Sequence, residues 1–215
     1  MKIVPSILAK NKAGFEKQWQ KVAPFFDYAQ IDIMDGHFVK NKNNIKPYNI
    51  QKITARHKLE IHLMVNDVPK YINLWETLPN VKKILWHYEA IKNDTAIIGL
   101  SEYLKKQKIK AGLCLNPETP LSAINGVAKY FDTIQVMGVN PGAQGKKFHT
   151  TSLARIKKLS KKYPQQKIAL DGGIDDKNFM AIKKSGADIV TPGHYLQQAK
   201  DIKQALKKLS SEKPR

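Results

Sequence analysis

The stretch YAQIDIMDGHF, residues 28–38, alternates polar and apolar residues in the way a β-strand does. Successive side chains of a strand point to opposite faces, so Gln30, Asp32 and Met34 share one face and the two isoleucines share the other. A half-buried strand usually turns its polar face to water. Here that face carries an acid and an Asp-Gly turn follows at once, which raises the question whether it lines a reaction chamber instead.

Segments like this one alternate with helical patterns from one end of the chain to the other. The expected strands lie at residues 2–8, 28–34, 59–65, 82–88, 109–115, 133–139, 167–173 and 187–193. The expected helices lie at residues 15–22, 47–57, 68–78, 95–108, 120–130, 150–163, 176–186 and 201–212. Strand-then-helix, repeated eight times in 215 residues, predicts one α/β domain over residues 1–215, with a parallel sheet closed into a (β/α)8 TIM barrel. The competing layout is an open doubly wound sheet, which more often has about five or six strands.

The composition is typical of a folded cytoplasmic protein. Hydrophobic residues make up 42% of the chain, and no run of about 18 apolar residues predicts a membrane span. The first residues fit a strand and not a secretory signal, and Cys114 is the only cysteine, which suits a reducing compartment. We therefore expect a cytoplasmic protein with no membrane partner.

The formal net charge of +19 raises the question of a nucleic-acid partner. Only Arg56, Arg155 and Arg215 among the 37 basic residues are arginine, whereas base edges and phosphate forks are contacted mainly by arginine. We expect no nucleic-acid partner. A positive field of this size would still concentrate an anionic small-molecule substrate.

In a TIM barrel, active sites form at the C-terminal ends of the strands. The inward positions there hold polar residues and methionines, namely Ser6, Gln30, Asp32, Met34, His62, Met64, His87, Met137 and Asp171. Asp32 alone could cap a turn, and His62 alone could be a satisfied core histidine. Several ionisable groups on one rim cannot all be buried without partners, so together they favour a site.

The two acids suggest a reaction. Because the second and seventh strands of an eight-stranded ring lie on opposite sides, Asp32 and Asp171 could approach a substrate from opposite faces. Inverting a carbon next to a carbonyl needs one base to remove a proton and one acid to return a proton across the plane. The enediolate formed in between needs a cation or fixed donors near its oxygens, and Asp32, His62 and Asp171 are competent ligands of a divalent ion.

Glycine-rich loops follow the last three expected strands. They are VNPGAQGKKF (139–148), DGGI (171–174) and TPG (191–193). Such loops expose backbone N–H groups, and a phosphate site near strands 7 and 8 recurs in this fold. The sequence therefore favours an anionic substrate.

The chain resembles the ribulose-phosphate 3-epimerase family over nearly its whole length. The matching segments are VPSIL (4–8), IDIMDGHFV (31–39), IHLMV (61–65), WHYEA (86–90), LNPETPL (115–121), VMGVNPG (136–142), QGKKF (144–148), LDGGI (170–174) and GADIV (186–190). Members of this family are TIM barrels that interconvert D-ribulose 5-phosphate and D-xylulose 5-phosphate by a two-aspartate, metal-assisted proton transfer. The resemblance implies a carbohydrate-phosphate isomerase with a divalent metal ion (Zn, Fe or Mn) and a sugar-phosphate substrate. It also makes a homo-oligomer plausible.

The resemblance also implies a role for individual residues. Asp32 matches the proton acceptor and Asp171 the proton donor, and His62 matches a metal ligand that also touches substrate. The implied metal ligands are therefore Asp32, His62 and Asp171. The implied substrate-binding residues are Ser6, Met34, His62, Met64, Met137, Gly142, Ala143, Gln144, Gly145, Gly172, Gly173, Gly193 and His194.

Three positions depart from the family pattern. Gln144 replaces a glycine of the phosphate loop, and His194 replaces a small serine after strand 8. Gln30 stands where the family has a histidine metal ligand, and an amide oxygen is a weaker ligand than imidazole for zinc or iron. Three outcomes stay open: a metal with Gln30 as a weak fourth ligand, a hydrogen bond from Gln30 in place of the metal, or faded catalysis. On the first, Gln30→His is expected to raise metal content and turnover.

Other functions compete with the pentulose-phosphate epimerase. A related enzyme could epimerise a ketohexose 6-phosphate such as allulose 6-phosphate, and a barrel with Gln30 and Gln144 could bind a sugar phosphate without chemistry. A decarboxylase or aldolase of the same superfamily is disfavoured, because Met34 occupies the place of the lysine in their Asp-x-Lys-x-x-Asp pattern.

Overall fold

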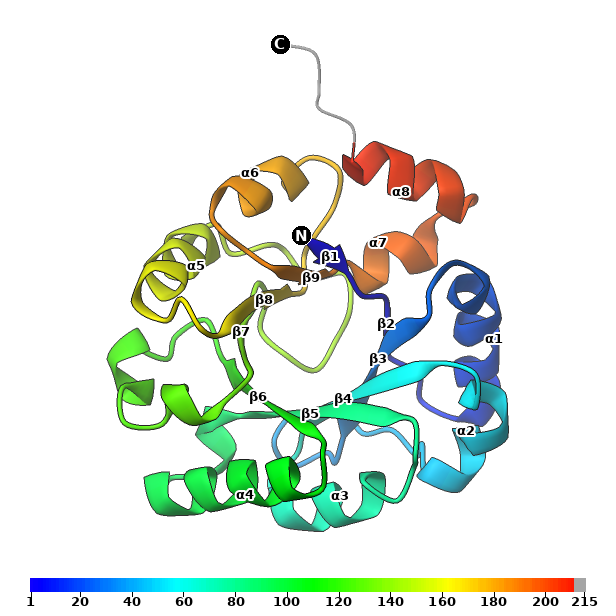
Figure 1. Cartoon of the computed structure of the whole chain (residues 1–215). Coiled ribbons are helices and arrows are strands. Elements are labelled where there is room, and N and C mark those ends of the chain that lie inside the picture. The colour runs from blue at the N-terminus through cyan, green and yellow to red at the C-terminus, as the bar shows by residue number, and fades with distance from the viewer. Residues whose placement is uncertain (211–215) are drawn as a thin grey trace.

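The strands of the chain close into a ring. A computed structural model describes residues 1–210, and its strands form one sheet in the order β1-β9-β8-β7-β6-β5-β4-β3-β2 (Figure 1). The strands are β1 (Lys2–Ile3), β2 (Ser6–Ile7), β3 (Tyr28–Met34), β4 (Lys58–Met64), β5 (Val81–His87), β6 (Lys110–Leu115), β7 (Thr133–Met137), β8 (Lys167–Asp171) and β9 (Ile189–Thr191). Every neighbouring pair is parallel. The α/β TIM-barrel prediction is confirmed.

The first barrel strand is split into two pieces, and this split closes the ring. β1 pairs with β9 and β2 pairs with β3, so one short stretch of chain bridges the two ends of the sheet. The interruption falls at Val4 and Pro5, where proline has no N–H to donate. Backbone bonding continues across it, because Val4 donates to Val190 O and Gln30 donates to Pro5 O, both at 2.9 Å.

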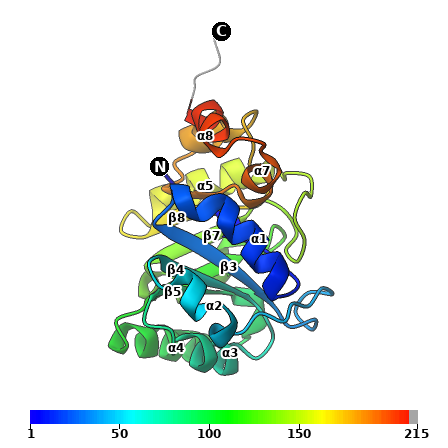
Figure 2. The ribbon, with the colours of Figure 1, turned by 90° about the vertical axis from the view of Figure 1, so that its right-hand side faces the viewer.

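Helices cover the outside of the ring (Figures 1 and 2). They are α1 (Lys12–Val22), α2 (Pro47–Thr54), α3 (Val68–Trp75), α4 (Asp94–Lys106), α5 (Thr151–Lys162), α6 (Phe179–Lys184), α7 (Gly193–Gln198) and α8 (Ile202–Ser210). The last expected helix, 201–212, corresponds to α8, and residues 211 and 212 lie outside the described residues. No helix within residues 1–210 is long and apolar enough to cross a membrane.

The expected helix at residues 120–130 was wrong. Two 3-10 turns occupy this crossover, η3 (Leu121–Ile124) and η4 (Ala128–Tyr130). Asn125, Gly126 and Val127 separate them, and asparagine and glycine favour turns over a helix interior. The apolar spacing that suggested a helix instead buries Ile124 and Ala128 from two separate turns.

The side chains of β3 point alternately to the hydrophobic core outside the sheet and to the inside of the barrel. Ile31 and Ile33 are buried in the hydrophobic core, which also contains Phe15 of α1 and Ile50 of α2. Gln30 and Asp32, on the opposite face, are buried inside the ring. The polar face of this strand therefore points into the barrel and not to solvent.

Seven of the 37 basic residues line one hollow at the N-terminal end of the barrel. A hollow of about 410 Å³ there is lined by Lys2, Lys58, Lys82, Lys83, Lys108, Lys110 and Lys167, with only Glu60 and Asp132 as acids. Lys83 Nζ lies 2.9 Å from Glu60 Oε2 in a buried ion pair. The basic end is thus opposite to the end at which this fold places its active sites.

Candidate active site

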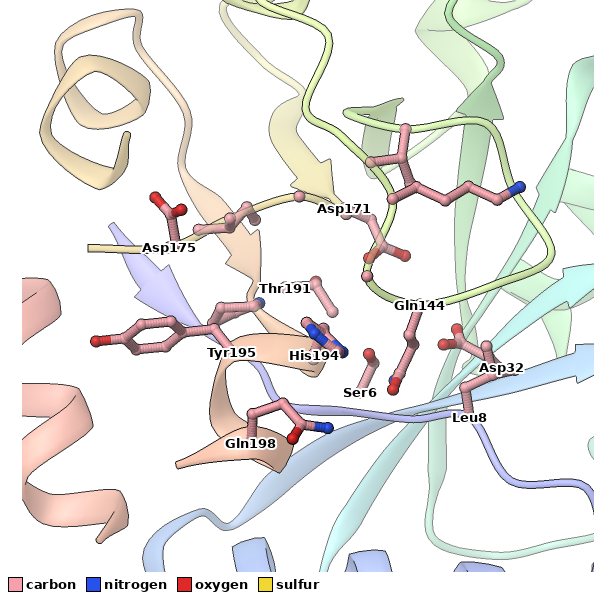
Figure 3. A pocket seen from close by; sticks show the side chains of 18 of the residues that line it. Ser6, Leu8, Asp32, Gln144, Asp171, Asp175, Thr191, His194, Tyr195 and Gln198 are labelled. Atoms are coloured by element: carbon pink, nitrogen blue, oxygen red, sulfur yellow. The ribbon is translucent and has the colours of Figure 1, made fainter. Parts of the chain in front are cut away.

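A cavity of about 710 Å³ opens at the C-terminal ends of the strands (Figure 3). It brings together most of the predicted site residues, namely Ser6, Asp32, His62, Met64, Met137, Gly142, Ala143, Gln144, Gly145, Asp171, Gly172, Gly173, Gly193 and His194. Met34 and Gln30 are buried and are not among the residues that line it. The structure thus assembles one continuous site from residues on or just after six strands, namely β2, β3, β4, β7, β8 and β9.

The two predicted catalytic acids converge on one point inside the barrel from two different strands. Asp32 lies on β3 and Asp171 ends β8, and the chain of β1 and β2 together with β9 separates these strands. Both side chains are largely buried and both line the cavity. His62 lies between them, with Nδ1 3.0 Å from Asp32 Oδ1 and 3.3 Å from Asp171 Oδ2. The register that pairs Asp32 with His62 on β4 sets this contact.

Gln30 bridges the two acids from below. Its Nε2 donates to Asp32 Oδ1 and to Asp171 Oδ2, each at 2.8 Å, and lies 3.4 Å from His62 Nδ1. Its side chain is fully buried, and its Oε1 has no hydrogen-bond partner within the described part of the chain. The amide nitrogen therefore occupies the point at which the acids and the imidazole converge (the convergence point).

The same three groups fit a divalent cation. The ligand atoms of Asp32, His62 and Asp171 all lie within 4.8 Å of one another, and carboxylate oxygen with imidazole nitrogen suits zinc, iron or manganese. Gln30 offers its N–H to the convergence point in this structure, but exchanging the two ends of its terminal amide would present the partnerless Oε1 there. With that exchange, four donors are available to an ion. A second cluster of possible ligands, His62, His87 and Cys114, lies deeper.

Burial and charge set the protonation of the central groups. Burial raises the pKa of Asp32, the Asp171 charge adds to this, and hydrogen bonds from His62 and Gln30 only partly oppose it. Burial also disfavours a charged His62, but its contacts with Cys114, Asp171 and Asp32 outweigh this and raise the pKa of the imidazole. The raised pKa lets Asp32 take up a proton more readily than an exposed carboxyl does, which suits a group that must accept a proton from substrate.

A second histidine supports His62 from behind. His87 is fully buried, with its Nε2 2.9 Å from His62 Nε2 and its Nδ1 3.5 Å from Glu89 Oε2. Glu89 in turn accepts hydrogen bonds from the Asn116 backbone N–H and the Thr119 hydroxyl. The pair of His87 and Glu89 thus contacts a central site group through His87.

Two glycines shape the part of the cavity beside Ser6 and His194. Gly145 has a positive φ of 76°, and a Cβ there would lie 3.2 Å from the His194 ring. At Gly193 a Cβ would overlap Ser6 Oγ and come within 3.3 Å of Gln144 Nε2. Figure 3 shows Ser6, Gln144 and His194 close together, between Asp32 and Tyr195. Only glycine leaves room for a ligand to reach these side chains.

Sequence reasoning missed several groups in or near the site. Gln135 donates from Nε2 to Asp171 Oδ2 at 3.3 Å, and Asn43 donates from Nδ2 to the Asp32 carbonyl at 2.7 Å. The period-2 rule would have found Gln135, which shares the inward face of its strand with Met137. Asn43 lies in a loop, where no periodicity points to it. Asp175 and Asp176 add acidic groups to the cavity rim.

Comparison with protein families agrees with this geometry. Residues 2–197 match the model described as the "Ribulose-phosphate 3 epimerase family". The chain belongs to the ribulose-phosphate 3-epimerase family. The match covers all nine strands and every predicted site residue.

Curated relatives of this epimerase family align over nearly the whole chain. A ribulose-phosphate 3-epimerase of Helicobacter pylori is 31% identical over 98% of this chain and 97% of its own length. That of Aquifex aeolicus is 35% identical over 97% of this chain and 95% of its own length. That of Bacillus subtilis is 29% identical over 99% of this chain and its full length.

Solved structures outside the epimerases share the fold alone. A 3-hexulose-6-phosphate synthase from Salmonella typhimurium superimposes with a TM-score of 0.71 at 15% identity, covering 98% of this chain and 97% of its own. A 3-keto-L-gulonate-6-phosphate decarboxylase from Vibrio cholerae gives a TM-score of 0.73 at 10% identity, covering 97% and 94%. At these identities the likeness extends to the barrel and not to its chemistry.

Proposed function

We propose that this chain is a ribulose-phosphate 3-epimerase, which interconverts D-ribulose 5-phosphate and D-xylulose 5-phosphate. The observation that carries the proposal is the convergence of Asp32 and Asp171 on one point of the cavity wall, from strands on two sides of the first barrel strand. Family membership and the glycine-shaped end of the same cavity support it.

In the proposed mechanism one carboxyl group removes a proton from C3 and the other returns a proton to C3. In the direction from ribulose 5-phosphate, ionised Asp32 removes the C3 proton from one face, and the electron pair passes to the C2 carbonyl to give an enediolate. Protonated Asp171 then returns a proton to C3 from the other face. In the reverse direction the two acids exchange roles. One acid must be protonated while the other is ionised, which the raised pKa of Asp32 favours in half of the cycle.

A divalent metal ion, which family membership implies, has a place in this proposal. Asp32, His62 and Asp171 would hold it, and Gln30 would add its amide oxygen. When bound, such an ion supplies positive charge beside the oxygens of the enediolate. Without an ion, Gln30 and His62 orient the acids, because each of them contacts both carboxylates.

The rest of the cavity is suited to a sugar phosphate. Ser6 and His194, near Gly145 and Gly193, lie at the end where backbone N–H groups can meet a phosphate. Met64 and Met137 supply an apolar wall next to the acids. Such a wall excludes water from the reacting carbon and lets its flexible thioethers follow the flat enediolate.

Solvent isotope exchange tests the function. Incubation with ribulose 5-phosphate in D₂O should produce xylulose 5-phosphate and place deuterium at C3 of both sugars, as followed by NMR. A parallel reaction with allulose 6-phosphate tests the related ketohexose epimerase, and the higher kcat/KM assigns the substrate. If neither sugar exchanges although ribulose 5-phosphate binds, the chain is a sugar-phosphate-binding relative and not an epimerase.

A further inference from the structure

We propose that Gln30 serves the site in two positions of its amide. Without a metal ion its N–H groups hold Asp32 and Asp171 together, and when an ion binds the amide turns so that its oxygen becomes a ligand. The inference rests on the proposed function for the roles of the two acids. Its test measures unfolding and metal affinity, so it can fail or succeed independently of turnover.

The bridging position uses both hydrogens of one nitrogen. Two carboxylates that approach one point in a buried site repel each other unless positive charge or N–H donors lie between them. Gln30 Nε2 has two N–H groups, and the two acceptors at 2.8 Å are one oxygen from each acid. Among side chains that are neutral at pH 7, only the primary amides of glutamine and asparagine can donate to both acids from one atom.

The other end of the amide indicates the second position. Oε1 of Gln30 is buried and lacks a hydrogen-bond partner among residues 1–210, which is unusual for a buried acceptor. The orientation is nevertheless forced when no cation is present, because the reverse one would point an oxygen at two carboxylate oxygens. A cation at the convergence point lies between these oxygens and offsets their repulsion, and it gives Oε1 the partner that it lacks.

A histidine at position 30 would behave differently. One imidazole nitrogen carries at most one hydrogen, so it cannot donate to both acids from the same atom. Histidine is, in turn, the stronger ligand for zinc. Glutamine therefore makes the barrel interior less dependent on the ion, and it lowers the affinity for that ion.

The experiment compares the wild type with Gln30→His and Gln30→Met. Each protein is stripped with EDTA, its thermal unfolding is measured, and Zn²⁺ binding to the stripped protein is titrated by calorimetry. Stripped Gln30→Met should unfold about 5–10 °C below the stripped wild type, and Gln30→His should also unfold below it, because both lose the bridge. The Zn²⁺ affinity should be roughly tenfold or more higher in Gln30→His and several-fold lower in Gln30→Met than in the wild type.

Gln135→Met is the matched control. Gln135 is also a buried, inward-facing amide, but it donates to Asp171 alone and at 3.3 Å. Its replacement should change the Zn²⁺ affinity by less than about twofold and lower the melting temperature of the stripped protein less than Gln30→Met does. Two results would overturn the proposal. If stripped Gln30→His is as stable as the stripped wild type, the Gln30 bridge does not stabilise the ion-free protein. If Gln30→Met binds Zn²⁺ as tightly as the wild type, Gln30 is not a ligand of the ion.

Discussion

His62 and His87 meet below the cavity with their Nε2 atoms 2.9 Å apart and their rings inclined by only 24°. One of the two nitrogens must donate and the other accept. Burial and the neighbouring positive His62 lower the pKa of His87, although Glu89 opposes this, whereas the pKa of His62 is raised. His62 therefore donates its Nε2–H to His87, and His87 carries its own hydrogen on Nδ1, toward Glu89. This arrangement fixes the His62 ring, with Nδ1 facing the acids.

Glu89→Gln should weaken catalysis although Glu89 touches neither acid. The neutral amide no longer selects the His87 tautomer that accepts from His62, and loss of such an outer partner commonly lowers activity by about 10- to 100-fold. We expect kcat/KM for ribulose 5-phosphate to fall by roughly tenfold, with most of the change in kcat. Glu102→Gln on the exposed surface of α4 is the control and should keep wild-type kinetics. Unchanged kinetics in Glu89→Gln would mean that Glu89 only fills space.

The same residue gives a prediction for acid stability. Burial raises the pKa of Glu89, but hydrogen bonds from His87, Thr119 and the Asn116 backbone outweigh it and hold the pKa below its usual value. A carboxyl with a lowered folded-state pKa contributes stability above its unfolded pKa and loses it as the pH falls through the folded value. The difference in unfolding free energy between wild type and Glu89→Gln should therefore be largest above about pH 4.5 and shrink below it. Urea unfolding from pH 7 to pH 3 measures it.

The parts of this molecule that follow from periodicity could be predicted from the sequence. Asp32 and Asp171 sit at strand ends on inward positions, and alternation alone is enough to place them there. The contacts of Gln30 could not be predicted, because they depend on strand register and on the rotation of one amide. The helix predicted at residues 120–130 was wrong for a local reason. Apolar spacing alone does not distinguish a helix from two successive turns when a glycine interrupts the segment.

Single replacement of each acid should separate the two halves of the reaction. With ribulose 5-phosphate in D₂O, Asp171→Asn should still exchange the C3 hydrogen through Asp32 but form no xylulose 5-phosphate. Asp32→Asn should neither exchange nor epimerise this sugar. Each variant should lose about 10³-fold or more in epimerisation. NMR of the recovered sugar reads out both quantities, and equal loss of exchange in the two variants would contradict a two-base mechanism.

Gly193→Ala should damage the anion end of the cavity. The added methyl would overlap Ser6 Oγ and crowd Gln144 Nε2. These side chains must therefore shift in the part of the cavity to which we assign the phosphate. We expect KM for ribulose 5-phosphate to rise by roughly tenfold or more, since one lost hydrogen bond to a charged group has about this effect. Steady-state kinetics measure the change.

Gly99→Ala is the control for the glycine substitution. Gly99 lies within α4, and nothing stands within 4 Å of the position that its Cβ would take. Alanine should raise the unfolding free energy by about 0.5–1 kcal/mol through helix propensity and leave kinetics unchanged. A rise in KM for Gly99→Ala equal to that for Gly193→Ala would show that the effect is not local to the anion end.

A double-mutant cycle should show that the buried ion pair at the other end of the barrel is specific and not intrinsically stabilising. Glu60 and Lys83 are 1% and 6% exposed and 2.9 Å apart, so removing either partner leaves the other charge buried. Lys83→Met alone should cost about 3–5 kcal/mol of unfolding free energy, because Glu60 must then take up a proton or draw in water. Glu60→Leu combined with Lys83→Met should cost much less than the sum of the two single changes, because neither charge remains. Urea unfolding at pH 7 measures all four proteins, and additive losses would mean that the two charges are already solvated separately.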